Sequence, residues 1–160
     1  MEGRQTIAVD LDGTIASYDG YKGAEEIGDP IPGAKEFMAL LCKKYKVLVF
    51  TCRVSVEFNP GYTGDHLKGI IVNWFQRHNI PYHEIYVGQG KPLASAYVDD
   101  RAVVCRPQEG KMDKQLGSVG TMHIYADTLN KIDKLTEEAE KSGDGDYTKE
   151  LARIRREQVG

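Results

Sequence analysis

Apolar residues along the chain follow two alternating spacings. Short continuous apolar runs with β-branched members are typical of buried strands, and they lie at residues 7–9, 47–50, 85–87 and 96–98. Between these runs, apolar residues recur every three or four positions, as in helices that bury one face. Strands of this kind alternating with amphipathic helices predict an α/β fold with a parallel sheet covered on both faces.

Two helices are predicted between the strands. Pro32 and Gly33 open the first, which runs to about Tyr45. Asp65 is the predicted N-cap of the second, and Asn79 with Pro81 ends it. The residues expected to face the core are Ala34, Phe37, Met38, Leu41, Leu67, Ile70, Ile71, Trp74 and Phe75.

The last third of the chain carries a weaker pattern. Residues 102–105 and 122–125 are candidates for further short strands, and a modest helical stripe begins near Leu129. We therefore divide the chain into a catalytic core, residues 1–125, and a helical extension, residues 126–160. The extension is expected to pack on the core or at an interface in a homo-oligomer, and a solvated tail is the alternative.

Composition narrows the class of protein. The 160 residues fit one domain, and 21 basic against 24 acidic side chains give a net charge of −3, without the overall positive field that nucleic-acid binding favours. Three cysteines without a paired pattern indicate a reducing compartment. With neither an apolar signal segment nor a membrane span in the sequence, a cytoplasmic protein with no membrane partner is expected.

Residues 7–14 carry the most informative chemistry. An apolar strand ends at Asp10 and Asp12, and Gly13 then turns the chain. Alternate residues of a strand point the same way, so both carboxylates are expected on one side and Leu11 on the other. Two adjacent carboxylates repel unless a cation neutralises them or one holds a proton. A simple Asp-Gly turn is the alternative, but it leaves the second carboxylate unexplained.

Polar side chains also follow the other predicted strands. Ligands of parallel sheets bind outside the carboxyl ends of the strands. The residues at those ends are Asp10, Asp12, Thr51, Arg53, Asp99 and Asp100. Several carboxylates at one sheet edge favour a hard cation with oxygen ligands, and Mg²⁺ is the natural candidate.

These residues resemble, in order, the four signature motifs of the haloacid dehalogenase-like (HAD) phosphohydrolases. The motifs are Asp10-Leu-Asp-Gly-Thr14, the apolar strand that ends in Thr51, Lys91, and the Asp99-Asp100 pair, and the resemblance covers roughly residues 6–106. It implies a three-layer Rossmann-like parallel sheet. It also implies a Mg²⁺-dependent phosphomonoesterase that works through an aspartyl-phosphate.

The resemblance gives Asp10 and Asp12 their roles. Asp10 would be the nucleophile. Asp12 would protonate the leaving oxygen and then deprotonate the attacking water. Mg²⁺ would lie between Asp10, the backbone carbonyl of Asp12 and the Asp99/Asp100 pair, with either member of the pair as the direct ligand and the other acting through water. The alternative is that one member of the pair forms an ion pair with Arg101 or Lys91.

The remaining motif residues would hold the phosphate. Thr51 would donate a hydrogen bond to it and Lys91 would bind it as a point charge. Arg53 is a candidate phosphate or substrate contact, with a surface ion pair as the alternative.

The predicted elements fill most of each interval between the motifs. Only about residues 16–31 and 54–64 remain, enough for flaps but not for a large cap domain. An open site is therefore expected, with a sugar phosphate or nucleotide as substrate, or else a nucleic-acid phosphate end. Aromatic residues of the flaps are candidates for stacking on a sugar or base, with ordinary packing as the alternative: Tyr18, Tyr21, Phe58 and Tyr62. A phosphotransferase and a retired domain kept for binding are the alternative functions.

Overall fold

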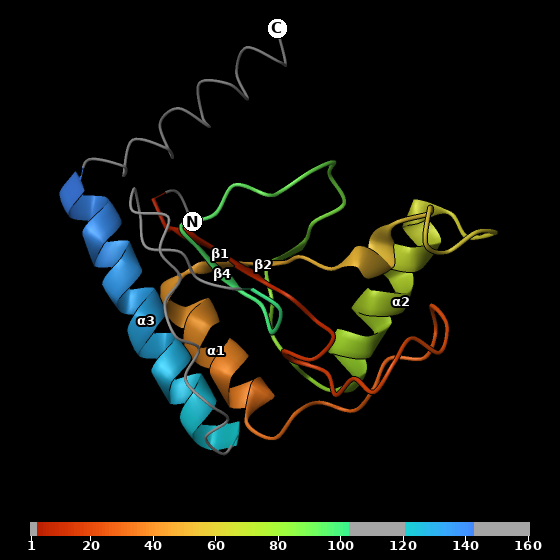
Figure 1. Cartoon of the computed structure of the whole chain (residues 1–160), viewed down its shortest axis with the longest axis horizontal. Helices are drawn as coiled ribbons and strands as arrows, with labels where there is room; N and C mark the ends of the chain where they lie inside the picture. The colour runs from red at the N-terminus through yellow and green to blue at the C-terminus, as the bar shows by residue number, and fades with distance from the viewer. Residues whose placement is uncertain (1–2, 103–120, 143–160) are drawn as a thin grey trace, which may run out of the picture.

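The computed structural model describes residues 3–102 and 121–142 and contains a four-stranded parallel sheet (Figure 1). The strands are β1 (Thr6–Val9), β2 (Lys46–Val49), β3 (Glu84–Ile85) and β4 (Ala96–Val98). Their order in the sheet is β3-β2-β1-β4, and every pairing is parallel. All four predicted strands are present, while the candidate strand at 102–105 lies, apart from Ala102, outside the described residues.

Helices cover both faces of this sheet. Figure 1 shows α1 (Ala34–Lys44) and α3 (Thr121–Ser142) side by side on one face, and α2 (Gly64–Arg77) on the other. The predicted three-layer α/β arrangement is confirmed. The described segments between β1 and α1 and between β2 and α2 are loops and one short 3-10 helix, η1 (Cys52–Val54), and contain no large cap.

The core forms where the apolar pattern predicted it. Ile7, Ala8 and Val9 of the central strand β1 are buried, as expected for a strand covered on both faces. Eight of the nine predicted helix residues are buried, and Ile70 is half-buried.

The start of α2 differs from the prediction. Thr63 is the N-cap, and its Oγ1 accepts a hydrogen bond from the backbone N–H of His66 at 3.2 Å. Asp65 lies in the first turn instead, where a carboxylate still favours the positive end of the helix dipole. Thr and Asp are both good caps, so the sequence alone did not distinguish the two positions.

Residues 122–125 belong to α3, so the prediction of a strand there is wrong. Ile132 of α3 is buried in the core. The Tyr45 hydroxyl at the end of α1 donates to Asp133 at 2.5 Å, and Lys44 pairs with the same carboxylate at 2.8 Å. The helix thus runs across residue 126, where the predicted extension begins, and it packs against α1. None of the described helices has both the length and the apolar character that a membrane span requires.

Candidate active site

The sheet register aligns the carboxyl ends of three strands. Val9 is level with Val49 of β2 and with Val98 of β4. The ladder continues one step further, since the Asp10 N–H donates to the Val98 carbonyl at 2.9 Å and the Phe50 N–H donates to the Val9 carbonyl at 2.8 Å. Asp10 is therefore held at the sheet edge directly beside the start of the Asp99-Asp100 pair.

A tight loop follows Asp10 and fixes its surroundings. The Leu11 side chain is buried in the core, and its carbonyl accepts the N–H groups of Ile15 and Ala16, each at 2.9 Å. Gly13 has a φ of 77°, and a Cβ there would overlap the Asp100 carboxylate. Gly13 is thus required both for the turn and for the close approach of Asp100.

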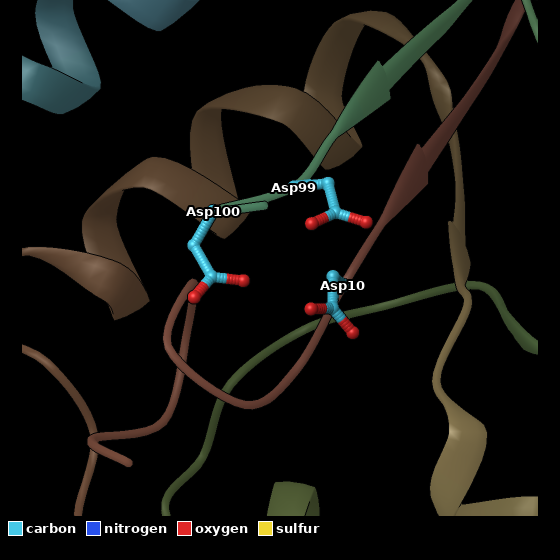
Figure 2. Close-up of side chains that lie close together, drawn as sticks. All are labelled: Asp10, Asp99 and Asp100. Atoms are coloured by element: carbon cyan, nitrogen blue, oxygen red, sulfur yellow. The ribbon is translucent and has the colours of Figure 1, made fainter. Parts of the chain in front are cut away.

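Three carboxylates meet at this edge. Figure 2 shows Asp10 from the end of β1 and Asp99 and Asp100 from the end of β4, with their carboxyl groups turned toward a common space. One carboxylate oxygen from each lies within 4.8 Å of the others. This all-oxygen donor set fits a hard divalent cation, and a nitrogen- or sulfur-loving metal would find no soft ligand in the cluster.

The position is electrostatically costly for Asp10. The pKa of Asp10 is raised from 3.8 to about 7, chiefly because burial disfavours the charged carboxylate; a hydrogen bond from the backbone of Leu11 opposes the shift, and the nearby negative charges of Asp99, Asp100 and Asp12 add to it. Without a cation, the carboxyl group of Asp10 is therefore only partly ionised at neutral pH. A divalent ion between the carboxylates would remove this repulsion and favour the ionised form.

Asp12 lies in a different environment from Asp10. Its Oδ2 accepts a hydrogen bond from Nε of Arg53 at 2.7 Å. Its Oδ1 is buried and has no hydrogen-bond partner among the described residues. Arg53 thus fixes the orientation of the carboxyl group, and Oδ1 is the oxygen that has no described protein partner.

Arg53 is buried, with 3% of its surface exposed, so the alternative of a surface ion pair is wrong. Its Nη1 donates to the carbonyls of Gly23 and Ala24 at 3.1 and 3.2 Å, and its Nη2 donates to the carbonyl of Glu26 at 3.0 Å. The guanidinium group therefore ties the loop after β1 to Asp12. The sequence pattern did not indicate this link.

The two motif residues that were predicted to hold the phosphate, Thr51 and Lys91, lie in different places. Thr51 is buried at the end of β2, and its Oγ1 accepts the backbone N–H of Arg53 at 3.3 Å. Lys91 is exposed, and its Nζ lies 4.1 Å from the centroid of the Tyr97 ring, which attracts the cation.

A cavity of about 530 Å³ opens over this edge of the sheet. Five of the predicted site residues line it, namely Asp10, Asp12, Thr51, Arg53 and Asp99. Asp100 joins Asp10 and Asp99 in the carboxylate cluster, whereas Lys91 does not line the cavity. The structure thus brings together every predicted site residue except Lys91.

No protein-family model matches the chain, and no curated protein matches it. Solved structures do match. A conserved protein from Bacteroides thetaiotaomicron is 23% identical with a TM-score of 0.49, over 80% of this chain and 91% of that one. A target protein from Vibrio cholerae is 21% identical with a TM-score of 0.49, over 84% and 98%. The D,D-heptose 1,7-bisphosphate phosphatase from B. bronchiseptica, crystallised with magnesium and phosphate, is 17% identical with a TM-score of 0.38, over 62% and 54%.

The structure places two further residues at the site, Arg101 and Thr14, which were not among the predicted site residues. Arg101 lines the cavity, with its guanidinium carbon 5.6 Å from the centroid of the Tyr18 ring and its Nε 3.9 Å from Asp100. Its place directly after the Asp pair was a signal that could have marked it as a cation at the site. Thr14 accepts the Asp100 N–H on its Oγ1 at 3.2 Å and so helps to position that carboxylate.

Proposed function

We propose that this chain is a Mg²⁺-dependent phosphomonoesterase of the HAD type, acting on a small phosphorylated substrate through an aspartyl-phosphate on Asp10. The observation that carries the proposal is the meeting of the Asp10, Asp99 and Asp100 carboxylates within 4.8 Å, beside a cavity that Asp10, Asp12, Thr51 and Asp99 line. A phosphatase of this type needs a cation site, a nucleophile and an acid/base group close together, and this cavity offers a residue for each.

The donor set supports Mg²⁺ as the cation. Asp10 and one or both of Asp99 and Asp100 would supply carboxylate oxygens, and the backbone carbonyl of Asp12 would supply another. When bound, the cation would neutralise the repulsion between these carboxylates and an incoming phosphate.

Asp10 fits the role of nucleophile because its carboxylate is partly buried and shares its space with two others. One Asp10 oxygen would attack phosphorus, and the bond from phosphorus to the leaving oxygen would break. Water would then attack the phosphorus of the aspartyl-phosphate and regenerate the carboxylate, so that two displacements replace one difficult step.

Asp12 fits the role of acid and base through a single oxygen. Arg53 occupies Oδ2, so the proton exchanged with the substrate would be carried by Oδ1, which has no other described partner. This oxygen would give its proton to the leaving group and then take one from the attacking water. Because Arg53 prevents the carboxyl group from turning, Oδ1 would keep one orientation during both steps.

The phosphate would be held from two directions. The Thr51 hydroxyl lines the cavity and has its hydrogen available for a phosphate oxygen, because its oxygen serves as the acceptor for Arg53 N–H. Lys91 would have to leave the Tyr97 ring to reach the phosphate. Arg101 already lines the cavity and is a second candidate for this positive charge.

A phosphotransferase would use the same groups, but it must keep water from the aspartyl-phosphate. The site lacks a large cap in the described part of the chain, and Asp99 and Arg101 are both exposed. This openness favours hydrolysis over transfer. A retired binding domain would retain the fold and the cation site without turnover.

Phosphate release from p-nitrophenyl phosphate tests the proposal, with Mg²⁺ and with a chelator. Wild-type protein should turn over only with Mg²⁺, and Asp10→Asn should lose the activity. Asp65→Asn, an exposed carboxylate of α2 outside the cluster, is the matched control and should keep it. Turnover that survives in Asp10→Asn would overturn the nucleophile assignment, and Mg²⁺ binding without any turnover would favour the retired domain.

A further inference from the structure

The cavity is larger than a phosphoryl group requires. Its volume of about 530 Å³ lies within the range of roughly 300–1,000 Å³ that is usual for pockets holding whole small molecules. The carboxylates of Asp10, Asp12 and Asp99 line only part of it. The remaining space is available to the organic part of the substrate.

Four aromatic rings line that remaining space. Two come from the loop after β1 and two from the segment that follows β2, and they are Tyr18, Tyr21, Phe50 and Phe58. Phe58 is 67% exposed and Tyr21 is 49% exposed. Because both rings are exposed and line the cavity, they offer apolar surface on which a ligand can pack.

Tyr21 is held in place before any ligand arrives. Its hydroxyl donates to Oδ1 of Asn59, and the guanidinium carbon of Arg53 lies 5.4 Å from the centroid of its ring. Asn59 is itself buried and donates to the carbonyls of Arg53 and Ser55 at 3.2 and 2.8 Å. A ring fixed in this way loses little conformational entropy when a flat group stacks on it.

Phe50 is fixed as well. It packs edge-on against Tyr86, with ring centroids 6.0 Å apart and an interplanar angle of 68°. Phe50 directly follows β2 and precedes Thr51, so this ring belongs to the rigid sheet edge rather than to a flap. Aromatic surface therefore reaches from the sheet edge to the exposed Phe58.

Two polar residues beside these rings, Asn59 and Arg53, are already engaged in hydrogen bonds with protein groups. Asn59 uses both amide hydrogens and its oxygen on protein groups. Arg53 donates from all three nitrogens to Asp12 and to backbone carbonyls. A sugar rich in hydroxyl groups would find few partners from these two residues, whereas a flat ring needs only faces on which to stack.

We propose that the aromatic part of the cavity holds the base of a nucleoside monophosphate, with the phosphate directed to Asp10. This inference rests on the proposed phosphatase function and names its substrate class. Stacking on aromatic rings accepts any base, because every base has a π-face, so the site should select nucleotides without strong preference among bases.

The test compares adenosine 5′-monophosphate with ribose 5-phosphate, which carries the same phosphate and leaving oxygen but no base. We expect kcat/KM with Mg²⁺ to be at least about tenfold higher for the nucleotide. Truncation of the exposed ring in Phe58→Ala should lower the ratio of the two kcat/KM values by about fivefold or more, toward equal values for the two substrates. Leu40→Ala, which truncates an exposed apolar residue of α1 outside the cavity, should leave the ratio unchanged.

If the wild-type protein has equal kcat/KM values for the two substrates, and if they stay equal in Phe58→Ala, the inference is overturned while the phosphatase function stands. If the wild-type protein shows no Mg²⁺-dependent turnover of any phosphate ester, p-nitrophenyl phosphate included, the proposed function itself is overturned. In that case calorimetric titration of the wild-type protein still decides the aromatic site. Binding of adenosine monophosphate that is stronger than that of ribose 5-phosphate and weakened by Phe58→Ala would uphold it, and equal binding or no binding would overturn it.

Discussion

The buried pair of Arg53 and Asp12 gives the sharpest prediction about stability. Arg53→Met keeps most of the side-chain length but removes the charge and every donor. It would leave the Asp12 carboxylate, whose side chain is 14% exposed, without a partner for Oδ2. It would also release the carbonyls of Gly23, Ala24 and Glu26.

The expected loss follows from these contacts. Removing one partner of a buried ion pair costs about 3–5 kcal/mol, because the other charge remains buried. A domain of this size is stable by about 5–15 kcal/mol, so the variant should fold but unfold at a much lower urea concentration. Arg53→Lys keeps the positive charge but cannot donate hydrogen bonds to Asp12 and to the three carbonyls at once. Arg53→Lys should therefore lose less stability than Arg53→Met.

The loss of unfolding free energy is measured by urea unfolding at pH 7 in the presence of chelator. Circular dichroism and the fluorescence of the buried Trp74 report the unfolding. The double variant Arg53→Met/Asp12→Asn should recover part of the loss, because the unpaired charge is gone. Lys22→Met, which breaks the exposed pair with Asp19, is the control and should change stability little. A loss below about 1 kcal/mol in Arg53→Met, with no recovery in the double variant, would refute the reasoning.

Further predictions concern the carboxylates and the helices. The folded pKa of Asp10 is raised from 3.8 to about 7, so the native state keeps a proton that the unfolded chain has lost. In chelator, stability should therefore fall as the pH rises from about 4 to 7, and Asp10→Asn should flatten this slope in urea titrations; an unaltered slope would contradict the shift. Mg²⁺ at about 100 times its Kd should stabilise the wild type by about 2.7 kcal/mol in thermal unfolding, and an equal gain in Asp10→Asn would argue against the cluster. Ile132→Ala should cost about 2–5 kcal/mol if α3 belongs to the core, whereas a negligible loss would make it an appendage. Thr63→Ala should cost about 0.5–2 kcal/mol by urea unfolding and more than Asp65→Ala, and the reverse order would contradict the observed cap.

Local pattern predicted the elements that depend on burial of one face. The sequence predicted the strands β1 and β2 and the core face of α1. A continuous apolar run matches a strand that is buried on both faces, and an apolar residue at every third or fourth position matches a helix that is buried on one face. The pattern failed at residues 122–125, where a short apolar run fits a strand or a helix equally well. Contacts with distant residues, such as that of Asp133 with Tyr45, decided for the helix.

The candidate site, too, was predicted only in part from the sequence. The sequence by itself placed Asp10, Asp99 and Thr51 at strand ends, and a parallel sheet brings its carboxyl ends to one edge whatever the details of the register. Only the tertiary structure decided what each polar side chain contacts. Arg53 lies 41 residues from Asp12 along the chain, yet it is buried against it and against the loop after β1. Lys91 stands over Tyr97 instead of lining the cavity. Periodicity determines which face a residue occupies, whereas the partner of a long side chain depends on which distant groups the folded backbone brings within its reach.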